Sequence, residues 1–248
     1  MDHCARLYQE AEPLAGAIAE FVGAGLRQGE AAVVIARREH RAAFLAKLDA
    51  RQALDEGGLR LLDAERTLER FMENGMPQWQ AFHEIIGGLI AEMRLQYPTV
   101  RAYGEMVDVL WQRGERAAAM RLEEYWNELG RLQTFSLLCG YRMDPLASEA
   151  YGGPLESVCG THTHLIPAQD VTRFDEAVRE ACRKILDQPL AQILLSLAAN
   201  HQSATRMPAG QVALFWLKQN MPRTAEKILA ELRAEALSAQ RAAASRAA

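Results

Sequence analysis

The most concentrated group of metal-ligating side chains lies in the run Cys159-Gly-Thr-His162-Thr-His164. A cysteine and a histidine three residues later can reach one metal ion from a helical turn or a tight loop. In an extended segment His162 and His164 would face the same side. A zinc site needs four ligands, or three and a water, and His3 or Cys4 can supply the fourth. A ligand-pocket wall or a buried thiol explains the same residues, so Cys159, His162 and His164 are candidates and the cofactor stays unknown.

Three further polar side chains are expected near the edge of a parallel sheet. Glu105 follows the apolar run 99–103, which contains Arg101, and Tyr141 ends the run 135–141. In open α/β sheets, ligands bind beyond the carboxyl ends of the strands. We therefore expect Glu105 to accept a hydrogen bond from a ligand or to pair with an arginine, for which Arg101 is the candidate. A structural salt bridge at Glu105 and a solvent-facing Arg101 are the alternatives.

The apolar run 31–36 ends where a nucleotide-binding α/β domain places its phosphate loop. The residues that follow are Arg37-Arg38-Glu39-His40-Arg41, with no glycine among them. Side chains there obstruct the approach of a phosphate to the backbone. No GxxxxGK[ST], GxSxG or HExxH motif occurs in the sequence. We expect neither ATP nor magnesium as a cofactor, although the two arginines at 37 and 38 can hold an anion.

The composition is that of an ordinary globular protein and excludes several classes. The net charge is -4, with 49% hydrophobic and 24% charged residues, so the basic surface that dominates nucleic-acid affinity is missing. No apolar run reaches the ~20 residues of a membrane span. The start of the chain lacks the features of a signal peptide, and the four cysteines are widely spaced, which is typical of reduced thiols. We expect a cytoplasmic, bacterial protein rich in alanine, arginine and leucine.

Short apolar runs alternate with helical patterns along the first two thirds of the chain. The helix near 116–131 is expected to turn Glu123 and Asn127 to solvent, although either residue can face inward. This alternation predicts βαβ crossovers and a mostly parallel sheet covered on both faces. The expected strands are 31–36, 59–63, 99–103 and 135–141, and the expected helices are about 14–25, 38–49, 77–96, 107–111 and 116–131.

Several short motifs follow one another between His3 and about Pro167. They are His3-Cys4 with Tyr8, Gly25-Leu26-x-x-Gly29-Glu30, Val100 to Met106, Leu110-Trp111 with Gly114, Leu122 to Leu129, Leu137 to Tyr141, and Cys159 with His162. In order and spacing, this stretch resembles the MEDS domain, the DcmR-type sensory domain of methanogens and methylotrophs. The resemblance implies a RecA/KaiC-like module that lacks the phosphate loop and senses small organic molecules, often attached to histidine kinases or DNA-binding domains.

The expected fold is therefore α/β, with a RecA/KaiC-like sheet flanked by helices and an all-helical C-terminal extension. The expected function is that of a non-catalytic sensory or regulatory protein, without a direct contact to nucleic acid or membrane. A metal-dependent enzyme using Cys159, His162 and His164, or a pure protein-interaction module, are the alternatives. The candidate ligand-binding residues are His3, Cys4, Tyr8, Arg101, Glu105, Tyr141, Cys159 and His162.

The chain changes character near residue 168. Residues 1–168 are expected to fold alone, and 169–248 to form helices near 171–186, 190–202 and 210–240, with a frayed end. Prolines at 189, 208 and 222 interrupt this extension. Its apolar stripes favour packing on the chain's own domain, homodimerisation, or docking on a histidine kinase or transcription regulator.

We expect the protein not to hydrolyse ATP and to bind it weakly at most, because the run 37–41 replaces a phosphate loop. Calorimetry with ATP and a magnesium-dependent turnover assay test this expectation. A micromolar dissociation constant together with turnover would contradict it.

Overall fold

The structure is a computed structural model that describes residues 2–151, 154–166, 171–205 and 207–247. Its main feature is a six-stranded sheet in the order β3-β2-β6-β7-β1-β8, in which every neighbouring pair is parallel. The expected α/β class is confirmed. The strands are β1 (His3–Tyr8), β2 (Ala31–Ala36), β3 (Leu59–Asp63), β6 (Val100–Gly104), β7 (Ser136–Arg142) and β8 (His164–Ile166).

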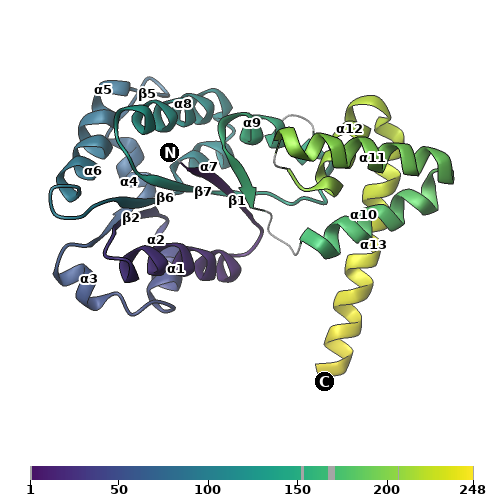
Figure 1. Cartoon of the computed structure of the whole chain (residues 1–248), viewed down its shortest axis with the longest axis horizontal. Helices are drawn as coiled ribbons and strands as arrows, with labels where there is room; N and C mark the ends of the chain where they lie inside the picture. Colours follow the sequence, from purple (N-terminus) through teal and green to yellow (C-terminus); the bar gives the residue numbers. More distant parts are fainter. Residues whose placement is uncertain (1, 152–153, 167–170, 206, 248) are drawn as a thin grey trace. The chain divides into compact units, whose positions relative to one another are not determined.

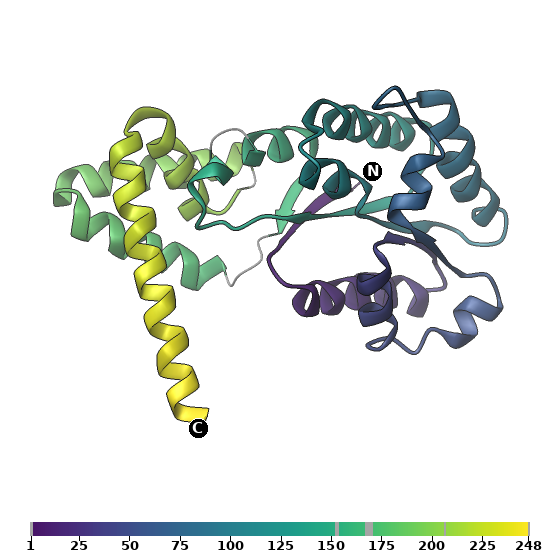
Figure 2. The same ribbon diagram turned by 180° about the vertical axis from the view of Figure 1, so that it is seen from behind.

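Helices cover both faces of the sheet (Figure 1, Figure 2). One face carries α1 (Ala11–Arg27), α2 (Arg38–Leu45) and α3 (Arg51–Asp55). The other face carries α4 (Ala64–Glu69), α5 (Trp79–Phe82), α6 (Gly88–Met93), α7 (Met106–Gln112) and α8 (Arg116–Leu132). The connections that follow β1 and β2 run in one direction along the sheet, and those that follow β3 and β6 run in the other. Because crossovers between parallel strands are right-handed, the helices of the first pair of connections lie on one face and those of the second pair on the other.

β2 and β6 are neighbours in the sheet, but the helices that follow them, α2 and α7, lie on opposite faces. This is the arrangement that opens a crevice at the carboxyl ends of parallel strands. β2 is apolar and buried at all six positions, as a central strand covered on both faces requires. Beneath α1, the core gathers Leu14, Ile18, Val22, Val34 and Phe44. The carboxyl edge therefore follows strands whose centre, β2, is fully buried.

Some expected elements differ in the structure. The sequence did not predict β1 or β8, which occupy one side of the sheet. The expected helix 77–96 consists of α5, a π-helical turn η1 (His83–Gly87) and α6, after a small hairpin of β4 (Met72–Glu73) and β5 (Met76–Pro77). At Gly87 a Cβ atom would lie 3.0 Å from Leu129 of α8, so the glycine permits this close approach.

The chain divides into two compact units. The α/β unit contains Met1–Arg142 and Thr161–Ile166, and the helical unit contains Met143–Gly160 and Pro167–Ala248. The sequence predicted one boundary near residue 168. In the structure, the segment 143–160 also belongs to the helical unit. It contains η2 (Ser148–Tyr151), which packs against α12 and α13, and α9 (Pro154–Thr161), whose last residue falls in the α/β unit. Whether residues 1–168 fold alone stays a prediction.

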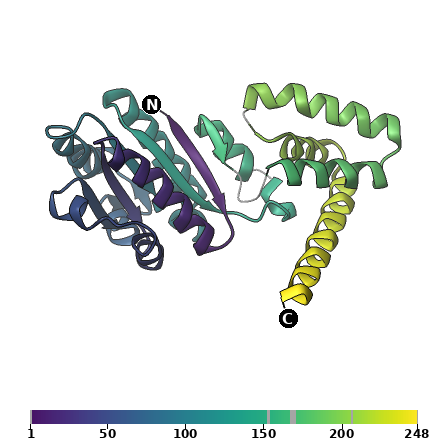
Figure 3. The same ribbon diagram turned by 60° about the horizontal axis from the view of Figure 1, so that its bottom comes forward.

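Four longer helices make up most of the helical unit. They are α10 (Val171–Ile185), α11 (Gln188–Thr205), α12 (Ala209–Asn220) and α13 (Pro222–Ala247). The expected helix 210–240 is thus two helices, because the chain turns at Met221 before Pro222. In Figure 3, α13 (yellow) continues well beyond the other helices of this unit. The sequence predicted a frayed end, whereas α13 extends to Ala247. No described helix is long and apolar enough to cross a membrane.

Candidate functional site

A network of buried charges lies at the carboxyl edge of the sheet, and Glu105 is its first centre. Glu105 follows β6 directly, its side chain is fully buried, and its backbone N–H donates to the carbonyl of Ile35 at 2.9 Å. Its Oε1 accepts from the hydroxyl of Tyr103 at 2.9 Å and lies 2.8 Å from Nδ1 of His40. Its Oε2 accepts from the backbone N–H of Arg37 at 2.9 Å. The carboxylate therefore sits at the N-terminus of α2, where a helix favours an anion.

Asp108, in the first turn of α7, is the second centre and is also fully buried. Its Oδ2 accepts from Nη1 of Arg37 at 2.8 Å and from the hydroxyl of Tyr8 at 3.0 Å. Its Oδ1 accepts from the backbone N–H of Arg142 at 2.9 Å and from Nε2 of Gln112 at 3.2 Å. We call Tyr8, Arg37, His40, Tyr103, Glu105 and Asp108 the edge network. It joins β1, β2, β6, α2 and α7 to the last residue of β7.

The two carboxylates shift the pKa values of their neighbours. Burial first, and then the charges of Asp108 and Glu105, raise the pKa of Tyr8, so its hydroxyl stays a donor. Burial and Glu105 likewise raise the pKa of Tyr103. Burial acts to lower the pKa of His40, but the hydrogen bond and charge of Glu105 outweigh it, and the pKa is raised. The network thus favours a protonated His40.

Gly140 in β7 makes room for the edge network. A Cβ atom at this position would collide with the hydroxyl of Tyr103 on the neighbouring strand. Without a side chain at 140, the Tyr103 hydroxyl can pass over β7 and still reach Glu105. A glycine inside a strand often marks such a close approach.

A second group of polar side chains lies within the α/β unit, on the face of the sheet covered by α8. His3 of β1, Glu123 of α8, Cys139 of β7 and His162, just before β8, place one potential ligand atom each within 4.8 Å of one another. Nε2 of His3 is 3.4 Å from the sulfur of Cys139 and 3.2 Å from Oε2 of Glu123. Nε2 of His162 is 3.5 Å from Oε1 of Glu123. We call these four residues the His–Cys cluster.

Neighbouring polar groups orient the His–Cys cluster. Nδ1 of His3 lies 3.0 Å from Oδ1 of Asn127, whose Nδ2 donates to the carbonyl of Thr161 at 3.0 Å. The hydroxyl of Tyr141 donates to Oε1 of Glu123. Burial acts to raise the pKa of Glu123, but the charge of His162 and the interaction with His3 lower it to about 2. Burial and the Glu123 charge raise the pKa of the Cys139 thiol.

Comparison with protein families identifies the part of the chain that carries these two groups. The model of the MEthanogen/methylotroph, DcmR Sensory domain (MEDS) matches residues 2–163. The chain belongs to the MEDS family. No curated protein matches it closely enough to add a named relative. The family gives the chain a sensory role, and residues 2–163 include all members of the edge network and of the His–Cys cluster.

The residues that were expected to form one ligand site lie in two separate groups of the MEDS domain, the edge network and the His–Cys cluster with its neighbours. Tyr8 and Glu105 meet in the edge network, while His3, Tyr141 and His162 meet around Glu123. The sequence raised His3 as a partner for His162, and the two rings are 4.0 Å apart.

Other expected residues lie elsewhere. Arg101 is near the amino end of β6; it pairs with Glu30, not Glu105, and its guanidinium also donates to the carbonyl of Phe21 at 3.1 Å. The prediction that Arg101 lies at the carboxyl edge is wrong, because Arg101 is only the second residue of β6. Cys4 packs against the core on the face covered by α1. Cys159 lies in α9, where burial raises its pKa to about 12.

His162 and His164 do not face the same side. The side chain of His162 is 1% exposed, whereas His164 in β8 is exposed. Neither Cys159 nor His164 joins the ligand group that forms among the described residues. Asp108, His40 and Cys139 were not predicted as site residues, and Glu123 and Asn127 were expected to face solvent. Only the helical spacing that lets Glu123 or Asn127 turn inward hinted at their role.

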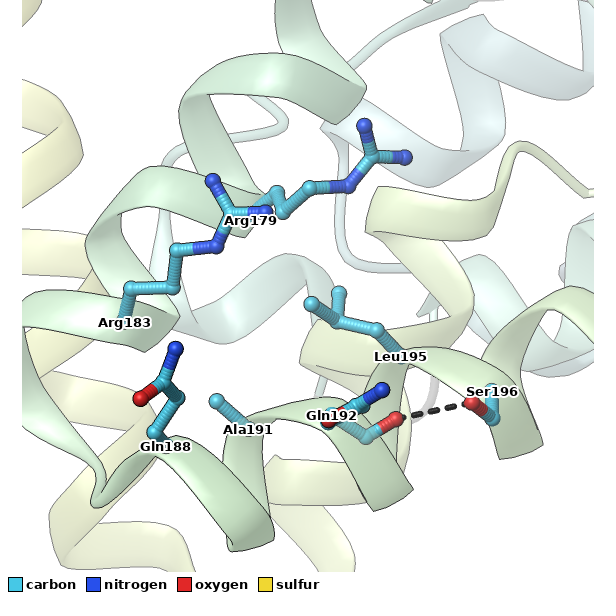
Figure 4. A pocket seen from close by; sticks show the side chains of 7 residues that line it. All are labelled: Arg179, Arg183, Gln188, Ala191, Gln192, Leu195 and Ser196. Atoms are coloured by element: carbon cyan, nitrogen blue, oxygen red, sulfur yellow. Dashed lines mark hydrogen bonds between the residues drawn. The ribbon is translucent and has the colours of Figure 1, made fainter.

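The helical unit has a pocket of its own, between α10 and α11 (Figure 4). Its volume is about 430 Å³. Arg179 and Arg183 on α10 face it, and Arg183 lies 3.7 Å from Glu180. Across from them are Gln188, Ala191, Gln192, Leu195 and Ser196 of α11. The lining is suited to an anionic or amide-bearing group.

We expect His40→Asn to destabilise the protein more at about pH 6 than at about pH 8. A raised pKa in the folded state stabilises the fold fully below the ordinary value of 6.5, and this contribution is lost as the pH rises through the raised value. Near pH 6 the loss should be about 1.5–3 kcal/mol, as for a hydrogen bond to a charged group. Urea unfolding across this pH range measures it.

The matched control is His164→Asn, which removes an exposed imidazole. It should change the free energy of unfolding by less than about 0.5 kcal/mol at either pH. An equal loss for His40→Asn at both ends of the range would show that its charge does not stabilise the edge network.

Proposed function

We propose that the protein is a non-catalytic sensory or regulatory protein of the bacterial cytoplasm, which binds a small organic molecule at the edge network. One observation carries the proposal: Asp108 holds both the Arg37 guanidinium and the backbone of Arg142. Arg142 is the last residue of the α/β unit before the chain enters the helical unit. A ligand that draws Arg37 away from Asp108 would therefore act on the first point at which the chain passes from one unit to the other.

The exposure of Arg37 supports binding of an acceptor-bearing ligand. Its side chain is 18% exposed, while Glu105 and Asp108 are fully buried. Nη1 is used by Asp108 and Tyr8, whereas Nε and Nη2 make no hydrogen bond to a described residue. A planar guanidinium with free donors suits a carboxylate, carbonyl or hydroxyl oxygen. The ligand class is thus a small molecule with at least one such oxygen.

The absence of catalysis is part of the proposal. The carboxylate of Glu105 takes the α2 N-terminus, the position that a phosphate would need, and like charges repel there. The enzyme alternative required Cys159, His162 and His164 around one metal, and these three do not form a group among the described residues. An interaction module without a ligand remains the second candidate, and the ligand experiment below separates it from a sensor.

The helical unit is the proposed output. We propose that it associates with a second copy of the chain or with a histidine kinase or transcription regulator, and does not itself contact nucleic acid or membrane. Ile193 and Leu197 support this, because they lie one turn apart on α11 and are 58% and 49% exposed. Apolar side chains exposed in pairs on one helix face favour protein association.

We expect small oxygen-bearing molecules to bind wild-type protein and to bind Arg37→Lys at least about tenfold more weakly. Lysine keeps a positive charge next to Asp108 but loses the outward donors of the guanidinium. Native mass spectrometry of protein isolated from its source cells tests for a retained ligand. Because the family is named for methanogens and methylotrophs, methanol, formaldehyde and formate are the first probes in NMR titrations.

Arg38→Lys is the matched control, since Arg38 is the next residue and is exposed. It should bind as wild type does. Equal weakening in both variants would move the site away from Arg37. A protein that carries no small molecule from its source cells and shifts with none of the probes would favour the interaction module.

We expect full-length protein to be a dimer that Ile193→Asp with Leu197→Asp converts to a monomer, because two buried charges oppose an apolar interface. Light scattering after size-exclusion chromatography measures the mass. Deletion of 169–248 is the less specific test, because it also removes Glu226 and Arg233, the partners of Ser148 and Leu146. Leu95→Asp, at an 85% exposed position of the α/β unit, is the control. A wild-type monomer would leave only docking on another protein.

A further inference from the structure

We infer that the His–Cys cluster is a binding site for a divalent transition metal of the zinc class. Two imidazoles, one thiol and one carboxylate are ligands that zinc accepts, and they come from β1, β7, α8 and the residue before β8. The inference does not rest on the proposed ligand site, because the cluster shares no residue with the edge network.

The spacing of the ligand atoms fits one small ion. Zinc bonds of ~2.0–2.1 Å to nitrogen or oxygen and ~2.3 Å to sulfur put tetrahedral ligand atoms roughly 3.3–3.5 Å apart. The Nε2 atom of His3 is 3.4 Å from the Cys139 sulfur and 3.2 Å from Glu123 Oε2. The Nε2 atom of His162 is 3.5 Å from Glu123 Oε1. These separations of 3.2–3.5 Å are close to tetrahedral edges and use both oxygens of Glu123; with one ligand atom from each residue, all four atoms lie within 4.8 Å of one another.

Burial distinguishes this group from ordinary surface clusters. The His3, Glu123 and His162 side chains are each no more than 1% exposed, and Cys139 is 1% exposed. A buried carboxylate normally has hydrogen bonds to both oxygens. Oε1 of Glu123 accepts from Tyr141, but Oε2 accepts no hydrogen bond from a described residue and only approaches His3 at 3.2 Å. An ion between the four side chains would satisfy Oε2.

The surrounding hydrogen bonds orient His3 as a ligand. Asn127 donates through Nδ2 to the Thr161 carbonyl, which can only accept, so its Oδ1 faces Nδ1 of His3. Nδ1 must then carry the proton, and Nε2 is the atom directed at Glu123 and Cys139. Ligating histidines are commonly held in this way by an acceptor on the other ring nitrogen.

A proton competes with the metal ion for the ligand atoms of the His–Cys cluster. Without metal, burial and the charge of Glu123 raise the pKa of Cys139, which remains a thiol. With metal, the thiol loses its proton and both imidazoles bind through Nε2. Metal binding would join Thr161–Ile166 to β1, β7 and α8. This short segment connects two parts of the helical unit along the chain.

Cobalt(II) is the probe, because a thiolate bound to it gives a charge-transfer absorption that a nitrogen or oxygen ligand does not. Full-length protein with a C-terminal tag free of histidine is stripped with a chelator, kept reduced with a phosphine, and titrated with Co²⁺. We expect one ion per chain, a thiolate band, and displacement of cobalt by Zn²⁺. A folded protein that shows no stoichiometric cobalt with this band would overturn the inference.

Matched variants identify the ligands. Cys139→Ser should remove the thiolate band, His162→Ala should weaken cobalt binding at least about tenfold, and Asn127→Ala about 10–100-fold through the orientation of His3. Cys159→Ser and His164→Ala, which alter the nearby residues outside the cluster, should bind as wild type. Loss of the band in Cys159→Ser but not in Cys139→Ser would overturn the assignment. If Cys139→Ser does not fold, the wild-type spectrum and His162→Ala decide it.

Discussion

Three fully buried carboxylates, Glu105, Asp108 and Glu123, impose the constraint on which the α/β unit depends. An ion taken out of water costs several kcal/mol unless donors or opposite charges surround it. No single element supplies enough of them: Asp108 needs Tyr8 from β1 and Arg37 after β2. The positions of the strand ends are therefore coupled through charge, in addition to the apolar core beneath α1.

The same coupling reaches the places where the chain leaves and re-enters the α/β unit. Arg142, at the exit, donates its backbone N–H to Asp108. Thr161 and His162, at the re-entry, contact Asn127 and Glu123 on α8. Two of the three points at which the chain passes between the units are thus held by buried polar groups, which respond to protons, ions and ligands more strongly than apolar packing does. A sensory role requires such a link between a chemical signal and the chain beyond it.

The strands β2, β3, β6 and β7 and the order of helices could be predicted from the sequence, because short, mostly apolar runs alternate with helical patterns. β2, which is buried at all six positions, is the clearest of them. β1 could not, since His3 and Arg6 interrupt its apolar residues without a regular alternation, and the segment lies at the start of the chain. The edge position of Glu105 followed from the strand before it. Its partners did not, because spacing along a helix does not show which polar residue of α7 or α8 turns inward. Asp108 and Glu123 each depend on tertiary contacts from distant strands.

The edge network and the absence of a GxxxxGK[ST] motif in the sequence concern the same position, the N-terminus of α2. The N-terminus of a helix after a parallel strand attracts an anion. In this chain Glu105, from the neighbouring strand, supplies that anion, and Arg37, the residue before α2, donates its backbone N–H to it. A phosphate could enter only by displacing a buried carboxylate, which would lose three hydrogen-bonding partners. The partly exposed guanidinium of Arg37 remains the accessible charge, so the ligand proposed for this edge would meet a side chain instead of the backbone.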